Sequence, residues 1–133
     1  MRQWNIKSED RLRRIAAGFT FAQGTAVDAN RPVEFLSVVI RPGDRVCLEG
    51  NNQKQADVLA GALADVDPQV LHDLHMVQSG VVLPEHLDLF EKGIAKKVDY
   101  SYSGPQAARI ARMLFSGKIE LGAIHTCVAL FAR

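Results

Sequence analysis

The sequence predicts an α/β fold with an open, mainly parallel sheet and flanking helices, preceded by one or two N-terminal helices. From residue 45 onward, short apolar runs of strand length alternate with segments whose apolar residues recur at helical spacing. Such alternation is typical of parallel strands joined by right-handed crossovers. The length of 133 residues and the ordinary composition fit one compact unit. Within it we distinguish an N-terminal helical segment, 1–44, from an α/β part, 45–133.

The N-terminal segment contains two predicted helices. Ser8, followed by two acidic residues, can cap the first helix, which we expect to end at Gly18. The second helix, 31–40, has Pro32 in its first turn, where the missing N–H group does no harm. The RPGD sequence at 41–44 then predicts a turn into the sheet.

The α/β part contains a regular series of predicted elements. The strand-like runs are 45–49, 70–78, 96–104 and 118–122. The helical patterns are 52–66, 83–93, 105–117 and 123–133. Proline and glycine stand at the starts and ends of several of these helices, in the positions that favour a helix N-terminus and a helix C-terminus, respectively.

The loops after the predicted strands are polar or contain glycine, whereas the strands are apolar. These loops read EGNNQKQ, VQSG, SYSGPQ and LGAIHT. Parallel α/β sheets bind ligands beyond the carboxyl ends of their strands, so we expect a ligand here. Gly50 permits a sharp turn, and the amides after it offer uncharged donors and acceptors before a helix N-terminus. The loop matches neither GxGxxG nor GxxxxGK[ST], and an ordinary strand-to-helix turn remains an equal alternative.

Other side chains near these loops each have a simpler alternative interpretation. Glu49 could act as a base or nucleophile, or pair with Lys54. His125 follows a predicted strand, where it could also be a helix cap. The serines at strand ends lie in no GxSxG sequence, so a hydrolase triad has no support.

The remaining histidines and the cysteines indicate no metal site. His72 and His75 are three residues apart, so a strand would point them to opposite faces. We expect His86 to face solvent from its helix. Cys47 and Cys127 lie in apolar runs, which predicts buried, unreactive thiols.

Charge and hydropathy exclude other classes of function. Lys and Arg number 16 and Asp and Glu 15, for a net charge of +1, which argues against nucleic acid or an anionic membrane as a partner. Arg11, Arg13 and Arg14 are interpreted as a solvated helix face. No apolar run approaches the roughly 20 residues that span a bilayer, and the N-terminus lacks the apolar core of a signal peptide. We therefore expect a cytoplasmic protein.

Long runs of the sequence resemble a known family. VCLEGNNQKQADVLAGAL, LHDLHMVQS, LPEHLDLFEKGIAKKVDYSYSGPQAARIARM and KIELGAIHT are similar, stretch by stretch, to the N-terminal part of malonate decarboxylase alpha subunits. More widely, the pattern resembles the N-terminal half domain of family I coenzyme A transferases, in which a strand ends in a glycine-containing loop and a later strand ends in Ser-Tyr-x-Gly, as YSYSG does here.

The resemblance implies a transferase that moves an acyl carrier protein from an acetyl thioester to malonate. The partners would be the acyl carrier protein and the other decarboxylase subunits, and the group contacted would be the phosphoribosyl-dephospho-coenzyme A (pantetheine) arm of the carrier, or coenzyme A. No cofactor would be bound covalently to this chain. Transferred by resemblance, the binding residues would be Gly50, Asn51, Asn52, Gln53, Gln78, Ser79, Ser103 and Gly104.

The resemblance also implies that this chain is incomplete as a catalyst. The family's subunits are several times longer, and the attacking glutamate of the wider transferase family lies in the second half. We therefore expect the main nucleophile outside this sequence, no activity from the chain alone, and self-association through uncovered sheet edge or apolar surface. The alternative is a non-catalytic α/β module for binding or subunit assembly. A small Rossmann-type nucleotide binder is a third option, which the missing glycine fingerprint argues against.

Overall fold

The structure is a computed structural model that describes residues 2–49, 56–78, 80–101 and 104–124. The described residues form a main sheet of four parallel strands in the order β3-β4-β5-β6. These strands are β3 (Arg45–Leu48), β4 (Leu74–Gln78), β5 (Ala95–Tyr100) and β6 (Glu120–Ile124). Each strand lies next to the one before it, so every crossover runs in the same direction. This arrangement confirms the predicted parallel α/β fold.

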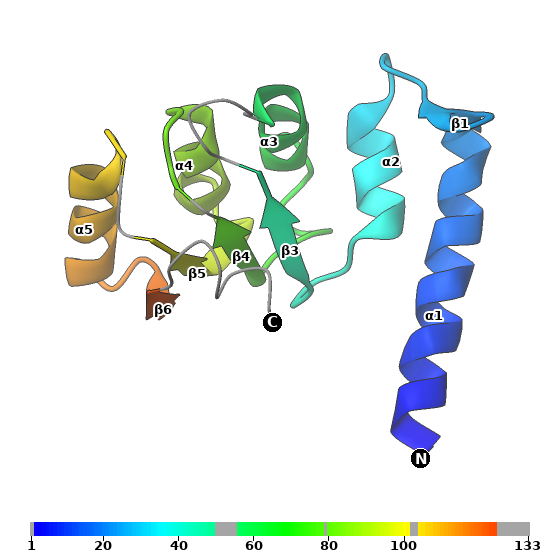
Figure 1. The fold of residues 1–133 in the computed structure, drawn as a ribbon, viewed down its shortest axis with the longest axis horizontal. Helices are drawn as coiled ribbons and strands as arrows, with labels where there is room; N and C mark the ends of the chain where they lie inside the picture. The colour runs from blue at the N-terminus through cyan, green and yellow to red at the C-terminus, as the bar shows by residue number, and fades with distance from the viewer. Residues whose placement is uncertain (1, 50–55, 79, 102–103, 125–133) are drawn as a thin grey trace.

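The crossover helices lie together on one side of this sheet (Figure 1). They are α3 (Asp57–Ala64), α4 (Glu85–Glu91) and α5 (Ala107–Phe115). Right-handed crossovers that all advance in one direction must place their helices on the same face. Consequently, one face of the sheet carries the apolar core and the opposite face is covered by none of α3, α4 and α5.

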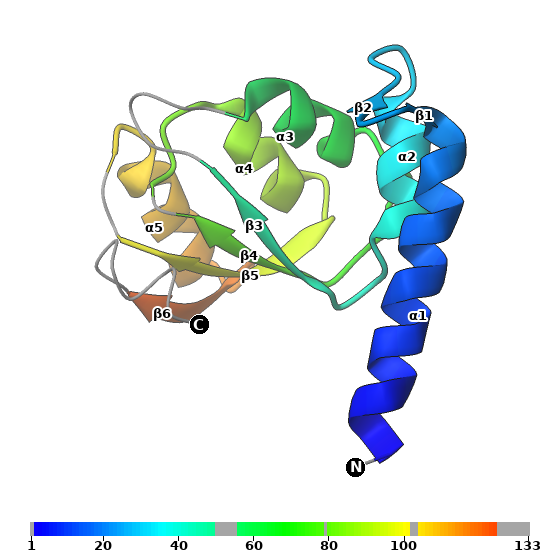
Figure 2. The same ribbon diagram turned by 45° about the vertical axis from the view of Figure 1, so that its right-hand side comes forward.

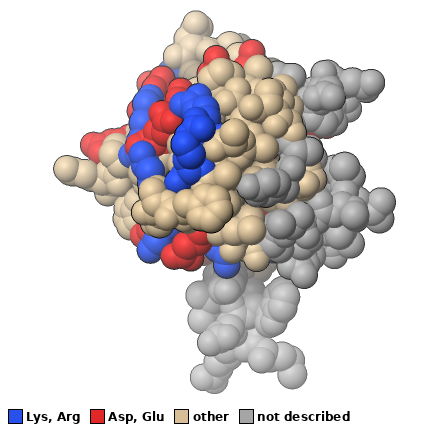
Figure 3. All heavy atoms as spheres, turned by 90° about the vertical axis from the view of Figure 1, so that its left-hand side faces the viewer, with Lys and Arg blue, Asp and Glu red and all other residues tan. Residues whose placement is uncertain are grey.

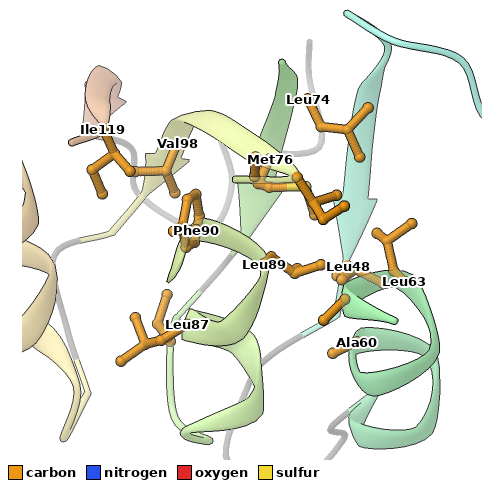
Figure 4. Packing of buried hydrophobic residues seen from close by; sticks show 14 of the residues in the cluster. Leu48, Ala60, Leu63, Leu74, Met76, Leu87, Leu89, Phe90, Val98 and Ile119 are labelled. Atoms are coloured by element: carbon orange, nitrogen blue, oxygen red, sulfur yellow. The ribbon is translucent and has the colours of Figure 1, made fainter. Parts of the chain in front are cut away.

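The core fills the space between the sheet and these helices (Figure 4). Leu74 and Met76 of β4 alternate with residues that point the other way, and both are fully buried. They meet Leu63 of α3 and Leu87 and Phe90 of α4, which belong to the same buried cluster. The helical and strand periodicities of the sequence thus converge on one apolar layer.

The N-terminal segment extends from the β3 end of this layer (Figures 1 and 2). It comprises α1 (Arg2–Gly18), a 3-10 turn η1 (Phe19–Phe21), a hairpin of β1 (Ala22–Gln23) and β2 (Ala26–Val27), and α2 (Pro32–Val39). Helix α2 contacts α3, and α1 contacts α2. A Cβ atom on Gly18 would lie 2.6 Å from Cγ1 of Val39, so glycine is what allows α1 and α2 to approach at this point.

Several predicted boundaries are wrong. Helix α1 begins at Arg2 instead of at Ser8, which therefore lies inside the helix and cannot cap it. Strand β4 begins at Leu74 instead of residue 70, because Asp73 has a φ of 57°, which an extended strand does not adopt. Strand β5 ends at Tyr100, well before residue 104.

The last predicted helix is also corrected where the structure describes it. Strand β6 continues through residues 123 and 124, which we had assigned to that helix. The pairing with β5 explains the extension, because Ala123 lies opposite Asp99 and Ile124 lies opposite Tyr100. The rest of the predicted helix, 125–133, including His125 and Cys127, lies outside the described residues.

Two predictions about side-chain exposure are wrong. His86 is fully buried, not solvent-facing, because α4 packs against both strand β5 and helix α3. Burial disfavours the imidazolium form and lowers the pKa of His86, although the negative charges of Glu85 and Asp57 oppose this shift. Cys47 is exposed, not buried, because it shares a strand face with Arg45, away from the core.

Candidate functional site

The carboxyl ends of the strands form a flush edge. Leu48, Gln78, Tyr100 and Ile124 are aligned across β3, β4, β5 and β6 and are the last residues of their strands. All loops that follow these strands therefore leave from the same edge of the sheet. This geometry is the one predicted from the polar and glycine-containing strand-end sequences.

Gln78 is the polar side chain at the centre of this edge. It is fully buried, and strand alternation places it on the same face as Leu74 and Met76 of the core. Neither its amide nitrogen nor its amide oxygen has a hydrogen-bond partner among the described residues. Leaving a buried amide unpaired costs about 1–3 kcal/mol, so a neutral hydrocarbon side chain would be favoured here for stability alone. Gln78 is consequently the described residue best suited to contact a polar ligand.

The loops after β4 and β5 pack directly against each other. Gly104 has a φ of 102°, and a Cβ atom on it would lie 2.7 Å from the backbone oxygen of Val81. The amide of Gln106 donates a hydrogen bond of 3.4 Å to the backbone oxygen of Val82. Any larger residue at position 104 would therefore push the two loops apart.

The loop after β3 has a fixed base. The backbone N–H of Ala56 donates to the backbone oxygen of Glu49 at 3.1 Å. This bond holds together the two residues that flank the predicted ligand-binding segment 50–55. Glu49 itself is exposed, and Lys54, its predicted alternative partner, lies outside the described residues.

The structure therefore describes only part of the predicted site. Gln78 and Gly104 lie at the carboxyl edge and in the adjoining loop, as the sequence predicted. The other predicted binding residues lie outside the described residues: Gly50, Asn51, Asn52, Gln53, Ser79 and Ser103.

A charged network on the opposite face of the sheet was missed by sequence reasoning. Asp99 of β5 is 2% exposed and lies 2.9 Å from Nε2 of His75 and 2.5 Å from Nη2 of Arg45. Burial alone would raise the pKa of Asp99, but the hydrogen bonds and positive charges of His75 and Arg45 outweigh it, so the pKa is lowered. Polar residues at alternate positions of otherwise apolar strands were the only sequence signal for this network.

Strand β6 is shaped around this network. The pairing of β5 with β6 has an irregularity in which Gly122 is left without a partner in the register. A Cβ atom on Gly122 would lie 2.0 Å from Oδ1 of Asp99 and 3.1 Å from Nε2 of His75. The network is therefore enclosed by β6 as well as by its own strands. Because Oδ2 of Asp99 accepts a hydrogen bond from Arg45 and Oδ1 lies beside His75, we interpret the network as a structural element.

A hollow lies by α5, away from the carboxyl edge. It has a volume of about 660 Å³ and is lined by Glu91, Arg109, Arg112, Met113, Ser116 and Lys118. Figure 3 shows cationic and anionic side chains side by side on the face that includes α5. Arg109 is paired with Glu91 at 2.6 Å, and Arg112 lies in the last turn of α5, where a cation offsets the helix dipole. Helix C-termini disfavour anions, so we do not assign a phosphate ligand to this hollow.

The described part of the chain contains no group of three or more His, Cys, Asp or Glu side chains that could hold a metal ion. Within the same residues, no helix has the length and apolarity needed to cross a membrane.

Arg14, which the sequence predicted to be part of a solvated face, is partly buried and pairs with Asp10 at 3.0 Å and Asp44 at 2.5 Å. Its role is to fix α1 to the turn before β3.

Comparisons with known proteins point to one family. Residues 3–133 match the family model described as "Malonate decarboxylase, alpha subunit, transporter". Over 131 residues the chain is 53% identical to the acetyl-S-ACP:malonate ACP transferase of Malonomonas rubra. This match covers 98% of this chain and 24% of the relative.

Two solved structures share the fold closely. One is a malonate decarboxylase alpha subunit from Acinetobacter baumannii, with a TM-score of 0.91 and 44% identity. The other is a Pseudomonas malonate decarboxylase hetero-tetramer in complex with malonate, with a TM-score of 0.91 and 52% identity. Each match covers 98% of this chain and 24% of the solved chain, so the chain spans about a quarter of the length of these relatives.

Proposed function

Because the chain belongs to the malonate decarboxylase alpha-subunit family, we propose that it is the N-terminal part of an acyl carrier protein transferase. In the proposed reaction, malonate displaces acetate from an acetyl-carrier thioester. The products are malonyl-carrier and acetate, and the carrier's thiol sulfur is acylated before and after the exchange. The Malonomonas rubra relative carries this activity in its name. We propose the complete reaction for the full-length subunit. For this chain we propose only that the carboxyl edge of its sheet binds the carrier's arm.

The observation that carries this proposal is the buried amide of Gln78 at the flush carboxyl edge, which has no hydrogen-bond partner among the described residues. Such an amide can donate to a thioester carbonyl or accept from an amide N–H of a pantetheine arm. We propose that it does so, with Gly104 permitting the close loop packing that frames the arm. Predicted contacts from the segment Gly50–Gln53, and from Ser79 and Ser103, complete the proposed site.

The chemical role proposed for this edge is to bind and orient. The thioester oxygen gains negative charge when a nucleophile attacks its carbonyl carbon, and N–H donors fixed in place stabilise that charge. The predicted 50–53 segment would supply backbone N–H groups of this kind. The attacking carboxylate would come from outside this chain, so the chain alone should bind the arm without transferring an acyl group.

Association with other subunits is part of the same proposal. The Pseudomonas relative was solved as a hetero-tetramer, so we propose that this chain, within its full-length subunit, also contacts other decarboxylase subunits and the acyl carrier protein. A cytoplasmic location is proposed with it.

The test uses acetyl-coenzyme A and coenzyme A as probes of the proposed edge. We expect calorimetry to detect binding to the 133-residue chain, and Gln78→Met to weaken it at least tenfold while raising the free energy of unfolding by about 1–3 kcal/mol. Gln69→Met is the matched control, since Gln69 is exposed and lies in the turn before β4, whereas Gln78 is at the opposite end of that strand. It should change neither quantity.

Other outcomes separate the alternatives. Unchanged binding in Gln78→Met would remove Gln78 from the site. No binding of either probe at millimolar concentration would refute the proposed binding edge and leave an assembly module as the function. Acetyl transfer to malonate by this chain alone would contradict our placement of the nucleophile elsewhere.

A further inference from the structure

His86 is a buried polar side chain without a hydrogen-bond partner among the described residues. Gln78, His86 and Asp99 are all buried although they are polar or charged. Asp99 is held by Arg45, whereas neither ring nitrogen of His86 is paired within the described ranges, and the same is true of the amide of Gln78. An unpaired buried imidazole opposes folding, so its position relative to Gln78 bears on the use of both groups.

His86 lies near the carboxyl ends of the strands. Helix α4 leads from the end of β4 back to the start of β5, so its first turn, which contains His86, is at the carboxyl end of the sheet. Phe90 and Met76 lie at a similar level in the core (Figure 4). His86 is about 6 Å beyond Phe90 on the same helix face, and Gln78 is about 6.6 Å beyond Met76 on the same strand face. The imidazole and the amide therefore belong to one layer of the core, just below the carboxyl edge.

The charges that act on His86 agree with this position. The carboxylate of Asp57, the first residue of α3, is close enough to favour the charged form of the imidazole, as is that of Glu85 on α4. Both helices begin after a strand-end loop, so His86 lies near the starts of two elements that border the proposed binding edge. Burial has the larger effect and lowers the pKa of His86, so the ring is neutral at pH 7.

A neutral imidazole and a glutamine amide have complementary uses in one layer. Each offers both a donor N–H and an acceptor atom without carrying a charge. A secondary amide in a ligand has one N–H and one carbonyl oxygen, so it is fully satisfied by one acceptor and one donor. The pantetheine arm of coenzyme A contains two secondary amides, and a site without water favours a ligand that satisfies every buried polar group.

We propose that His86 is a further binding residue of the carboxyl edge and that, together with Gln78, it holds one amide group of the pantetheine arm. One of the two side chains would accept from the amide N–H, and the other would donate to the amide oxygen. This inference rests on the proposed function, because it takes the arm as the ligand. It assigns to this layer the amide part of the arm, and not the thiol or the nucleotide.

The test measures binding of coenzyme A and of pantetheine to the 133-residue chain at pH 8 by nuclear magnetic resonance titration. His86→Leu should weaken both probes at least tenfold, because it removes the donor and the acceptor together. His86→Gln should keep both affinities within about threefold of the parent chain, since its amide supplies both functions. A purely structural role predicts the opposite order, because leucine suits a buried position better than glutamine does.

Two further measurements address the pairing of His86 with Gln78. In a double-mutant cycle, the losses in His86→Leu and Gln78→Met should not add, because both residues hold the same amide. The nitrogen-15 signals of the His86 ring in the parent chain provide a measurement that needs no variant. They should shift when pantetheine is added, whereas the ring signals of His72 should not.

His72→Leu is the matched control, because His72 is partly exposed and precedes β4, at the opposite end of that strand from Gln78. It should leave both affinities unchanged. Unaltered binding in His86→Leu, additive losses in the cycle, or His86 ring signals that do not respond to pantetheine would each overturn the role of His86 and leave the binding edge in place. If the parent chain binds neither probe, the binding edge itself is refuted, and this inference with it.

Discussion

Replacing Gly122 by alanine tests whether the Asp99 network is built around a missing side chain. The new Cβ would lie 2.0 Å from Oδ1 of Asp99, far inside contact distance, so the carboxylate must move. The same oxygen lies 2.9 Å from Nε2 of His75, and polar contacts of a charged group are worth about 1.5–3 kcal/mol. Arg45 is 42% exposed, so water can replace part of its contribution. We expect a loss of about 2–3 kcal/mol in the free energy of unfolding.

The assay is urea unfolding followed by circular dichroism. With a slope of about 1–3 kcal/mol per molar, typical of small domains, the midpoint should fall by about 1–2 M. Gly61→Ala is the matched control, because nothing lies within 4 Å of a Cβ atom at that position of α3. It should stabilise the protein by about 0.5–1 kcal/mol, since alanine favours a helix over glycine.

A double-mutant cycle identifies the cause of the loss. If the clash with Asp99 is responsible, Gly122→Ala should cost less than about 1 kcal/mol in an Asp99→Ala background, because contacting residues do not add independently. Additive losses would refute this reasoning and leave the general strain of strand β6 as the explanation.

Two further predictions concern burial and close packing. The pKa of His86 is lowered mainly because the side chain is buried, so as the pH falls the unfolded chain takes up the proton before the folded chain does. The contribution of His86 to stability should therefore be complete above about pH 6.5 and decline below it. His86→Leu should flatten this dependence in unfolding midpoints measured between pH 8 and 5.5. A stability change in His86→Leu that is equal at every pH in this range would contradict the prediction. Gly18→Ala should destabilise the protein by about 1–3 kcal/mol, despite the usual gain from alanine in a helix, because its Cβ would lie 2.6 Å from Cγ1 of Val39. Differential hydrogen exchange should show the loss concentrated in α1 and α2; unchanged protection there would argue against a tight contact.

The order of strands and helices could be predicted because periodicity and turn residues are local. Exposure was harder, because it depends on which face of an element packs. Cys47 is exposed because it alternates along the strand with Val46 and Leu48, which point into the core. An apolar run in the sequence does not show which of its residues face the core. His86 lies in a helix whose neighbours Leu87 and Phe90 are both buried, so the helix has little solvent-facing surface.

The alignment of the strand ends could be predicted, whereas the side-chain pairings around them could not. The polar strand-end loops indicated the carboxyl edge, and Gln78 lies there. The network of Arg45 and Asp99 joins residues that are 54 positions apart, and only the sheet register brings them together. Local patterns contain no information about such pairings, so sequence reasoning could not connect them.

Two buried polar groups in neighbouring strands therefore call for opposite interpretations. Asp99 is paired with Arg45 and His75, so its burial is compensated within the fold and its loss should reduce stability. Gln78 is buried without such compensation among the described residues, so its loss should increase stability. We therefore propose that Gln78 serves ligand binding, because the carboxyl edge of a parallel sheet is where such folds bind their ligands. Asp99 supports the sheet, whereas Gln78 is the residue that we propose for contact with a thioester arm.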